Sequence, residues 1–360
     1  MGNREIEKIK AQVREKILAG EGLSKDLARK LFSLPLTHLG ELAQLMRFQI
    51  HPEKIVTYVV DRNINYTNIC ISRCKFCAFY KVPSSPEGYL LSFEEIAQKI
   101  EETLALGGYQ ILLQGGLHPD LSLEYYENLF SFIKKRFPQI HLHALSPPEI
   151  IFLSRRANLE VNEVLKRLME AGLDSIPGGG AEILVDRVRK IISPNKCSAE
   201  EWLLVMETAH TLGLKTTATM MFGHIETEEE ILEHLFKIRD LQSRTHGFTA
   251  FIPWTFQPQN TALSHIKKVG SARYLQILAI SRVVLHNVPN IQVSWVTQGP
   301  KIAQLALEFG GNDFGSTMIE ENVVASTGVY HRLTEEEIRQ LITEAGYLPK
   351  RRKMDYTSIE

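Results

Sequence analysis

Apolar residues recur every three or four positions through the first fifty residues, which is the spacing of one face of a helix. The residues that carry this pattern are Ile6, Ile9, Val13, Ile17, Leu27, Leu31, Leu42 and Leu45. Glycines within residues 20–22 and a proline at position 35 interrupt it. We therefore predict two or three amphipathic helices between residues 4 and 50, with a packing role.

From residue 58 onward, short apolar or β-branched runs alternate with helical patterns. The predicted strands are 58–62, 109–113, 140–144, 175–176, 215–222, 247–252 and 291–295, with a weaker eighth near 312–314. The helices between them are 92–106, 123–137, 161–171, 199–212, 228–244, 272–285 and 301–309. Alternation of this kind predicts a parallel sheet with right-handed crossovers.

Seven or eight such units fit an α/β fold of the (βα)8 TIM-barrel type better than an open doubly wound sheet, which stays the alternative. The predicted organisation is a helical extension over residues 1–52, a barrel over 53–330, and a C-terminal helix and tail over 331–360. Polar and glycine-rich segments follow the predicted strands at 114–119, 143–149, 177–182 and 223–226. In a barrel these segments meet at the face where function collects.

Composition narrows the function classes. The 360 residues are 44% hydrophobic and 23% charged with a formal net charge of -1, so no basic surface for nucleic acid is indicated. No apolar run approaches the roughly twenty residues that span a bilayer. The N-terminus has no apolar leader segment, and the chain has only four cysteines. We therefore expect a cytoplasmic protein with reduced thiols.

Three of the four cysteines, Cys70, Cys74 and Cys77, lie within eight residues, while Cys197 is isolated. A structural zinc site usually closes with four protein ligands, and no second close pair of cysteines or histidines is present to complete one. Three thiolates on a 4Fe-4S cluster would leave one iron without a protein ligand. The spacing favours such an open cluster, with zinc or buried, inert thiols as the alternatives.

The same segment, with Phe76 before the third cysteine, resembles the signature of radical S-adenosylmethionine (SAM) enzymes. The resemblance implies a 4Fe-4S cluster ligated by Cys70, Cys74 and Cys77, with SAM on the fourth iron. It also implies cleavage of SAM to a 5′-deoxyadenosyl radical. An external electron donor such as flavodoxin or ferredoxin would reduce the cluster. The cofactor carries the difficult chemistry, and the protein orients and secludes it.

Further SAM contacts are implied by the position of residues within the family pattern. Gly115 and Gly116 are expected to meet the SAM amino group through their main chain, although Leu117 replaces the acid of the usual motif. Glu182 is a candidate for the ribose hydroxyls, the alternative being an acidic residue in the first turn of a helix at 183–189. Met221 is a candidate for packing on the adenine, the alternative being a core methionine.

Three residues after predicted strands are candidates for a catalytic base. His143, His224 and Glu149 are titratable groups that could accept a proton during turnover. The competing interpretation for each histidine is an ordinary hydrogen-bonded structural group.

Most of the chain is similar to one branch of the radical SAM family, which serves menaquinone and deazaflavin biosynthesis. The segments that carry the likeness are 74–80, 114–120, 141–150, 174–182, 249–258 and 294–300. They look most like the cyclases of the futalosine route, which implies dehypoxanthine futalosine as substrate. The alternatives are an aminofutalosine synthase of the same route, a non-catalytic iron–sulfur or zinc protein, and a binding module with inert thiols.

Overall fold

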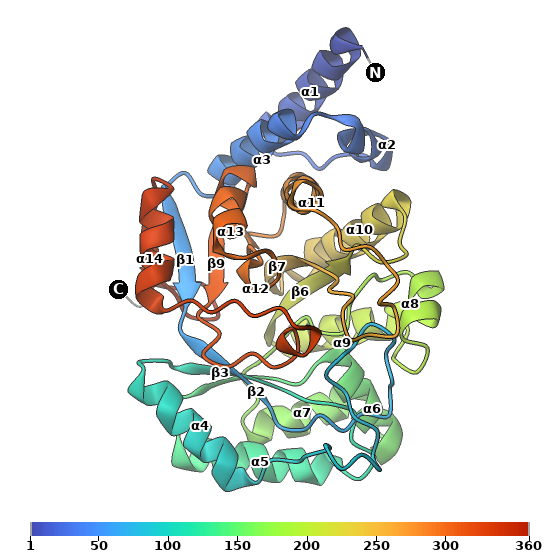
Figure 1. Cartoon of the computed structure of the whole chain (residues 1–360), viewed down its shortest axis with the longest axis vertical. Helices are drawn as coiled ribbons and strands as arrows, with labels where there is room; N and C mark the ends of the chain where they lie inside the picture. The colour runs from blue at the N-terminus through green and yellow to red at the C-terminus, as the bar shows by residue number, and fades with distance from the viewer. Residues whose placement is uncertain (1, 359–360) are drawn as a thin grey trace.

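The computed structural model describes residues 2–358, and a curled sheet of parallel strands forms its centre (Figure 1). Within those residues seven strands pair in the order β2-β3-β4-β5-β6-β7-β8. They are β2 (Asp61–Asn65), β3 (Gln110–Gln114), β4 (His141–Ala144), β5 (Ser175–Ile176), β6 (Lys215–Phe222), β7 (Phe248–Thr255) and β8 (Asn290–Ile291). All neighbours in this sheet run parallel, as the alternation of strands and helices predicted.

A second, three-stranded sheet has the order β10-β1-β9, built from β10 (Leu348–Arg351), β1 (Ile55–Val59) and β9 (Asp313–Ser316). The amide of Val293, just after β8, donates to the carbonyl of Asp313 at 2.9 Å. Since β1 runs into β2 through Val60 alone, the strands continue around the barrel from β8 to β9 and β1. The predicted α/β architecture of the TIM-barrel type is confirmed.

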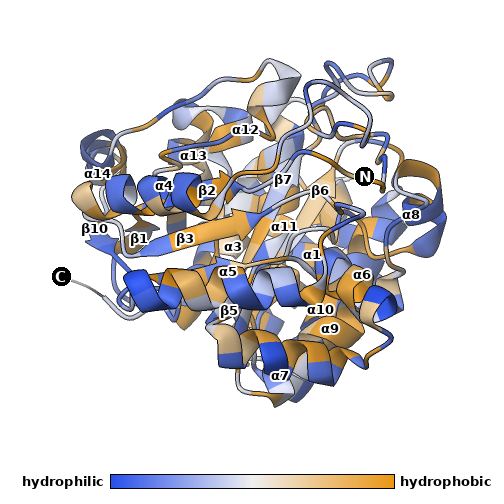
Figure 2. Ribbon diagram, turned by 90° about the horizontal axis from the view of Figure 1, so that it is seen from below, coloured by the Kyte–Doolittle hydropathy of each residue, from blue (hydrophilic) through white to orange (hydrophobic). Residues whose placement is uncertain are grey.

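Helices cover the outside of the curled sheet, except that the short α12 (Trp295–Gln298) contributes to the cavity wall. Their bounds are α4 (Phe93–Ala105), α5 (Leu123–Arg136), α6 (Pro147–Ala157), α7 (Val161–Ala171), α8 (Asp186–Ile192), α9 (Ala199–Thr211), α10 (Glu228–Thr245), α11 (Ser271–Val284), α12 (Trp295–Gln298), α13 (Pro300–Ala306) and α14 (Glu335–Glu344). Short 3-10 turns occupy Leu31–Ser33, Leu307–Phe309 and Ala325–Thr327. Capping boxes define the starts of α4, α9, α10 and α14. Apolar residues concentrate on inner strands such as β3 (Figure 2).

Three predicted elements differ most from the observed bounds. The single strand 58–62 is instead two strands that divide at Val60, because β1 pairs with β9 while β2 pairs with β3. The strand 291–295 ends at Ile291, and Trp295 begins α12, where its indole nitrogen donates to the Ser316 carbonyl at 3.0 Å. The helix placed at 183–189 is α8, which begins only at Asp186. Apolar character alone does not tell which neighbour a buried segment will pair with.

The N-terminal helices are α1 (Asn3–Leu18), α2 (Lys25–Lys30) and α3 (Leu36–Ile50), and they extend from one end of the molecule, where α3 packs on α11 (Figure 1). The helical pattern in residues 4–50 is thus confirmed. The division at residues 52 and 330 stays a prediction, and its outermost residues 1, 359 and 360 lie outside the described chain. No helix within residues 2–358 is long and apolar enough to cross a membrane.

Candidate active site

The barrel encloses a cavity of about 280 Å³ whose wall combines a mostly apolar surface with several polar side chains. Side chains from successive strands contribute to it, among them Asp61, Asn63, Gln110, Gln114, His143, Thr217, Thr219, Trp254 and Gln292. The interior of a TIM barrel is usually filled by layers of branched apolar side chains. An unfilled interior, mostly apolar with a few polar side chains that converge on it, therefore indicates a site for a small ligand.

The three cysteines lie in the irregular loop between β2 and α4. The sulfur of Cys70 accepts a hydrogen bond from the Leu117 amide at 3.3 Å, and the sulfur of Cys74 lies 3.2 Å from the Ser72 hydroxyl. Burial raises the pKa of Cys74 to about 11 and also raises the pKa of Cys77. Within residues 2–358 no three Cys, His, Asp or Glu side chains already converge as metal ligands. Because the pKa of Cys74 and of Cys77 is raised, metal binding here must displace thiol protons.

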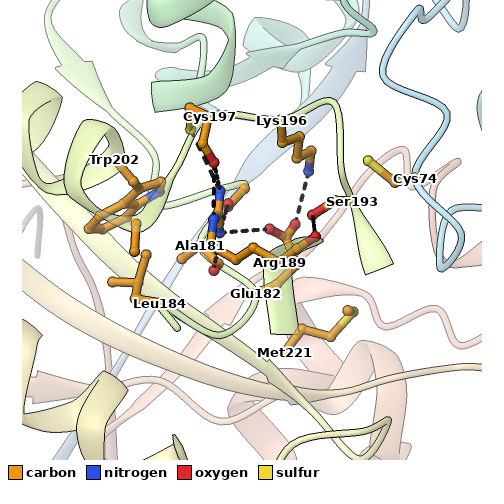
Figure 3. Close-up of polar contacts among 12 residues, drawn as sticks. Cys74, Ala181, Glu182, Leu184, Arg189, Ser193, Lys196, Cys197, Trp202 and Met221 are labelled. Atoms are coloured by element: carbon orange, nitrogen blue, oxygen red, sulfur yellow. Dashed lines mark hydrogen bonds and ion pairs between the residues drawn. The ribbon is translucent and has the colours of Figure 1, made fainter. Parts of the chain in front are cut away.

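A buried group of charges lies beside this loop (Figure 3). The Lys196 ammonium is 2.9 Å from one oxygen of Glu182, and Arg189 is 3.5 Å from the other. Burial lowers the pKa of Lys196, but its interactions with Cys74 and with the Glu182 carboxylate outweigh that effect and raise the pKa above its ordinary value. The ammonium also lies 5.0 Å from the centre of the Phe76 ring. Lys196 thus brings a positive charge to the cysteine loop, and this charge favours the thiolate form that binds a metal.

Glu182 itself has a backbone φ of +41° and precedes α8, so it is not an acidic residue in a helix's first turn. Its carboxylate is buried at 4% exposure, and the residue contributes to the cavity wall. The carbonyl of Glu182 accepts the amide of Met221 at 3.0 Å. Met221 is buried and does not line the cavity.

Gly115 and Gly116 are packed too closely to carry side chains. A Cβ on Gly115 would come within 2.5 Å of the Tyr66 ring, and one on Gly116 would overlap the Ile69 carbonyl and approach Cys70 Cβ to 2.8 Å. Their amides are already used, with Gly115 donating to Glu149 at 3.1 Å and Gly116 donating to a main-chain carbonyl at 3.0 Å. Only their carbonyl oxygens are therefore left for a ligand.

Glu149 supports the first glycine of this pair, Gly115, through a hydrogen bond. It lies in the first turn of α6, and its carboxylate accepts from the Tyr66 hydroxyl at 2.6 Å and from the Ser146 hydroxyl at 2.5 Å, in addition to Gly115. Burial raises the pKa of Glu149 to about 7. The structure thus places Glu149 behind the cavity wall, where it positions other residues.

The two histidines named from the sequence lie in different surroundings. His143 lines the cavity, and its Nδ1 lies 2.7 Å from the Ser175 hydroxyl. Burial lowers the pKa of His143 well below its usual range. His224 does not line the cavity, and its side chain is fully buried, with Nε2 3.0 Å from the Met221 carbonyl and Nδ1 accepting the Ile225 amide at 2.8 Å. Only His143 among the candidate bases faces the cavity.

Sequence reasoning missed Arg352, which reaches the cavity from the C-terminal tail. Its Nε donates to the buried Asp313 carboxylate at 2.6 Å, and its guanidinium lies 4.1 Å from the centre of the Tyr356 ring. The basic run at 350–353 gave no signal for this position, because only the pairing of β10 with β1 carries the tail to the barrel floor.

Comparison with known proteins identifies the class. Residues 64–238 match the model of the radical SAM superfamily, and residues 245–360 match that of the CofH/MqnC C-terminal region. The chain belongs to the radical SAM superfamily. The FeFe-hydrogenase maturase HydG from Carboxydothermus hydrogenoformans shares the fold, with a TM-score of 0.76 and 18% identity over 98% of this chain and 82% of that one.

The chain is 47% identical to the cyclic dehypoxanthine futalosine synthase of Halalkalibacterium halodurans over 96% of this chain and 94% of that protein. It is 45% identical to the protein of the same name from Streptomyces coelicolor over 96% of this chain and 88% of that protein. A Methanosarcina acetivorans protein of a different name, 5-amino-6-(D-ribitylamino)uracil–L-tyrosine 4-hydroxyphenyl transferase 1, is 40% identical over 98% of this chain and 95% of that protein. Membership of the superfamily implies a 4Fe-4S cluster and SAM as cofactors.

Proposed function

We propose that the chain converts dehypoxanthine futalosine to cyclic dehypoxanthine futalosine on the futalosine route to menaquinone. The observation that carries the proposal is the 47% identity to a protein of that name across 96% of the chain. The cavity supports it, because the substrate combines a sugar with an aromatic carboxylate, and the wall offers both polar side chains and apolar surface.

In this proposal Cys70, Cys74 and Cys77 hold three irons of the cluster, and SAM occupies the fourth. The carbonyl oxygens of Gly115 and Gly116, the Glu182 carboxylate, and the Phe76 and Met221 side chains form the SAM site. The donor set fits, because three thiolates beside the Lys196 charge suit a cluster with one open iron. When bound, these cofactors supply the 5′-deoxyadenosyl radical and accept one electron back.

The chain's own residues then bind, orient and deprotonate the substrate. Hydrogen is removed from carbon 4′ of the ribose, the sugar radical adds to the benzoate ring, and restoration of aromaticity releases one proton and one electron. His143 is the proposed proton acceptor, because burial favours its neutral ring, which has an unprotonated nitrogen, and because it lies in the cavity wall. Glu149 and His224 remain candidate bases, but both lie outside the cavity wall and are therefore weaker candidates than His143. Fixed geometry makes the hydrogen transfer effectively intramolecular.

The competing activity with a specific observation in its favour is transfer of a 4-hydroxyphenyl group from tyrosine, since a relative of that name is 40% identical over 98% of the chain. Aminofutalosine synthesis is the further alternative within the same route. Anaerobically reconstituted protein, incubated with SAM, a strong reductant and each substrate in turn, separates the three by mass spectrometry. Cyclised product from dehypoxanthine futalosine supports the proposal, and product from another substrate alone contradicts it. The physiological reductant is proposed to be flavodoxin or ferredoxin.

The role of His143 has its own experiment. In a His143→Gln variant, SAM cleavage should continue while cyclised product falls by roughly 10²-fold or more. His224→Gln and Glu149→Gln are the parallel variants. The variant that still forms deoxyadenosine but loses cyclised product identifies the base. Normal cyclisation by all three would contradict this part of the proposal.

A further inference from the structure

Two histidines of one strand share a single serine hydroxyl. The Nδ1 atom of His143 and the Nε2 atom of His141 each lie 2.7 Å from the Ser175 Oγ. Both histidines come from β4, two residues apart and hence on one face of the strand, and Ser175 lies opposite His143 on β5. The three side chains therefore form a continuous hydrogen-bonded row inside the barrel.

The ends of this row lie in different environments. His143 is 5% exposed and lines the cavity, whereas His141 is only partly buried and does not line it. His141 lies at the start of β4, toward the end of the barrel opposite the strand ends that carry the glycine and cysteine loops. The row thus leads from the reaction cavity to the opposite end of the barrel.

We propose that His143, Ser175 and His141 form a proton relay that carries the proton released in the cavity to solvent. The inference rests on the proposed cyclisation, in which a ring C–H bond breaks. Its proton passes to Nε2 of His143, and the oxidised iron–sulfur cluster that Cys70, Cys74 and Cys77 would hold would supply the one-electron acceptor for its electron. Ser175 and His141 act through His143 and are positioning residues.

Each proton has a defined path along the row. In the resting arrangement His143 donates from Nδ1 to Ser175, whose hydroxyl donates to Nε2 of His141. A proton that arrives at Nε2 of His143 makes its Nδ1 proton move to the serine oxygen, and the serine proton move to His141. His141 then releases its own Nδ1 proton to solvent. One passage converts both rings from the Nδ1–H to the Nε2–H tautomer, and atoms and charge balance.

The charges around the row permit this transfer. His141 faces Asp174, Lys134 and Asp355, and its ring lies 6.4 Å from that of Tyr109. His143 faces His141 and Arg352. Burial lowers the pKa of both histidines and so favours the neutral rings, each of which has one unprotonated nitrogen that can take a proton as the other nitrogen gives one up. Lys134 and Asp174 form an ion pair of 2.5 Å, which offsets their charges near His141.

The test is a Ser175→Ala variant of the full-length holoenzyme. Cyclised product per deoxyadenosine should fall roughly tenfold to a hundredfold while SAM cleavage continues, since general base catalysis is interrupted and not radical generation. The acidic limb of the pH profile for product formation should also move, because the two rings no longer exchange a proton. His141→Gln should also lower the amount of cyclised product per deoxyadenosine. This second variant tests the relay even if Ser175→Ala does not fold.

Thr216→Val is the matched control, because it removes another hydroxyl that contacts a histidine. The Thr216 hydroxyl lies 2.7 Å from Nε2 of His210, and neither residue lines the cavity. This variant should keep the wild-type product ratio. If Ser175→Ala and His141→Gln also keep it while the wild type cyclises dehypoxanthine futalosine, the relay is wrong and the proposed function stands. If the wild type forms no cyclised product, both fall.

Nitrogen-15 NMR of the histidine rings in the oxidised wild-type protein gives a readout without turnover. The relay requires His141 and His143 to share one tautomer, because the single serine proton fixes both rings. His141→Gln and His143→Gln spectra assign the signals. Matching tautomers support the relay, and opposite tautomers overturn it.

Discussion

Lys196 and Glu182 form a 2.9 Å ion pair beside the cysteine loop, and the same carboxylate is the counter-charge for Arg189 at 3.5 Å. All three side chains are at most 16% exposed. Two cations thus share one anion, which leaves a net positive charge close to Cys74. That excess favours thiolate over thiol when a metal displaces the protons.

A Glu182→Gln substitution tests how far this pair holds the site together. It leaves two buried cations without a full counter-charge, which typically costs about 3–5 kcal/mol. The free energy of unfolding, measured by urea denaturation, should fall by an amount of that order. Iron uptake should fall as well, because the loop at 193–197 loses its anchor to the barrel.

Glu207→Gln is the control for that experiment. Glu207 pairs with Arg244 at 3.2 Å, but the two side chains are 43% and 57% exposed. Exposed ion pairs contribute at most about 1 kcal/mol. Equal losses in the free energy of unfolding would show that the buried pair stabilises the protein no more than the exposed pair does.

Replacement of each clustered cysteine tests the metal site directly. Cys70→Ala, Cys74→Ala and Cys77→Ala should each abolish stable cluster assembly and SAM cleavage, because two thiolates cannot hold a cluster with an open iron. Iron and sulfide analysis after anaerobic reconstitution gives the result. Cys197→Ala, which removes the remaining buried thiol, should retain the cluster. Zinc in place of iron in the wild type would contradict the assignment.

A methyl group at Gly116 should disturb the cysteine loop from the neighbouring strand end. Gly116→Ala would overlap the Ile69 carbonyl, so either the loop or the β3 end must shift. We expect reduced iron incorporation with little change in secondary structure by circular dichroism. Gly270→Ala is the control, because a Cβ there meets nothing within 4 Å and its φ is ordinary. Full iron content in both variants would contradict a close fit at Gly116.

The buried Glu149 predicts a pH-dependent stability. Its pKa is about 7 in the folded protein against 4.5 for an unperturbed glutamate, so the folded state retains a proton that the unfolded state has lost between these values. Stability should therefore fall as pH rises from 4.5 to 7, by about 3 kcal/mol in total from this group. Glu149→Gln should remove that dependence. Urea unfolding at a series of pH values checks it, and an unchanged slope would refute the buried-proton account.

Much of the fold followed from local patterns. Strands β5 and β6 were predicted at 175–176 and 215–222, as they are found, because turn residues bound each run clearly. The strand at 58–62 failed because its two halves find different partners, one of them near the chain's end. Such long-range pairing leaves no mark within the segment itself.

The candidate site divides in the same way. The cysteines and the glycine pair were visible because they occur in a motif. Lys196, Arg352 and Ser175 were not, since each is a single ordinary residue that the barrel brings to the site. His143 and His224 looked alike in sequence. Only the folded path of the chain places His143 in the cavity wall and His224 in a buried loop.

The position of β1 has a consequence for synthesis on the ribosome. β1 is translated early, yet both of its hydrogen-bonded neighbours, β9 and β10, are among the last strands to be made. A nascent chain therefore carries an open strand edge until translation is nearly finished, and such edges recruit other strands. Nonsense products that stop before Leu348 should be cleared by proteases or held by chaperones.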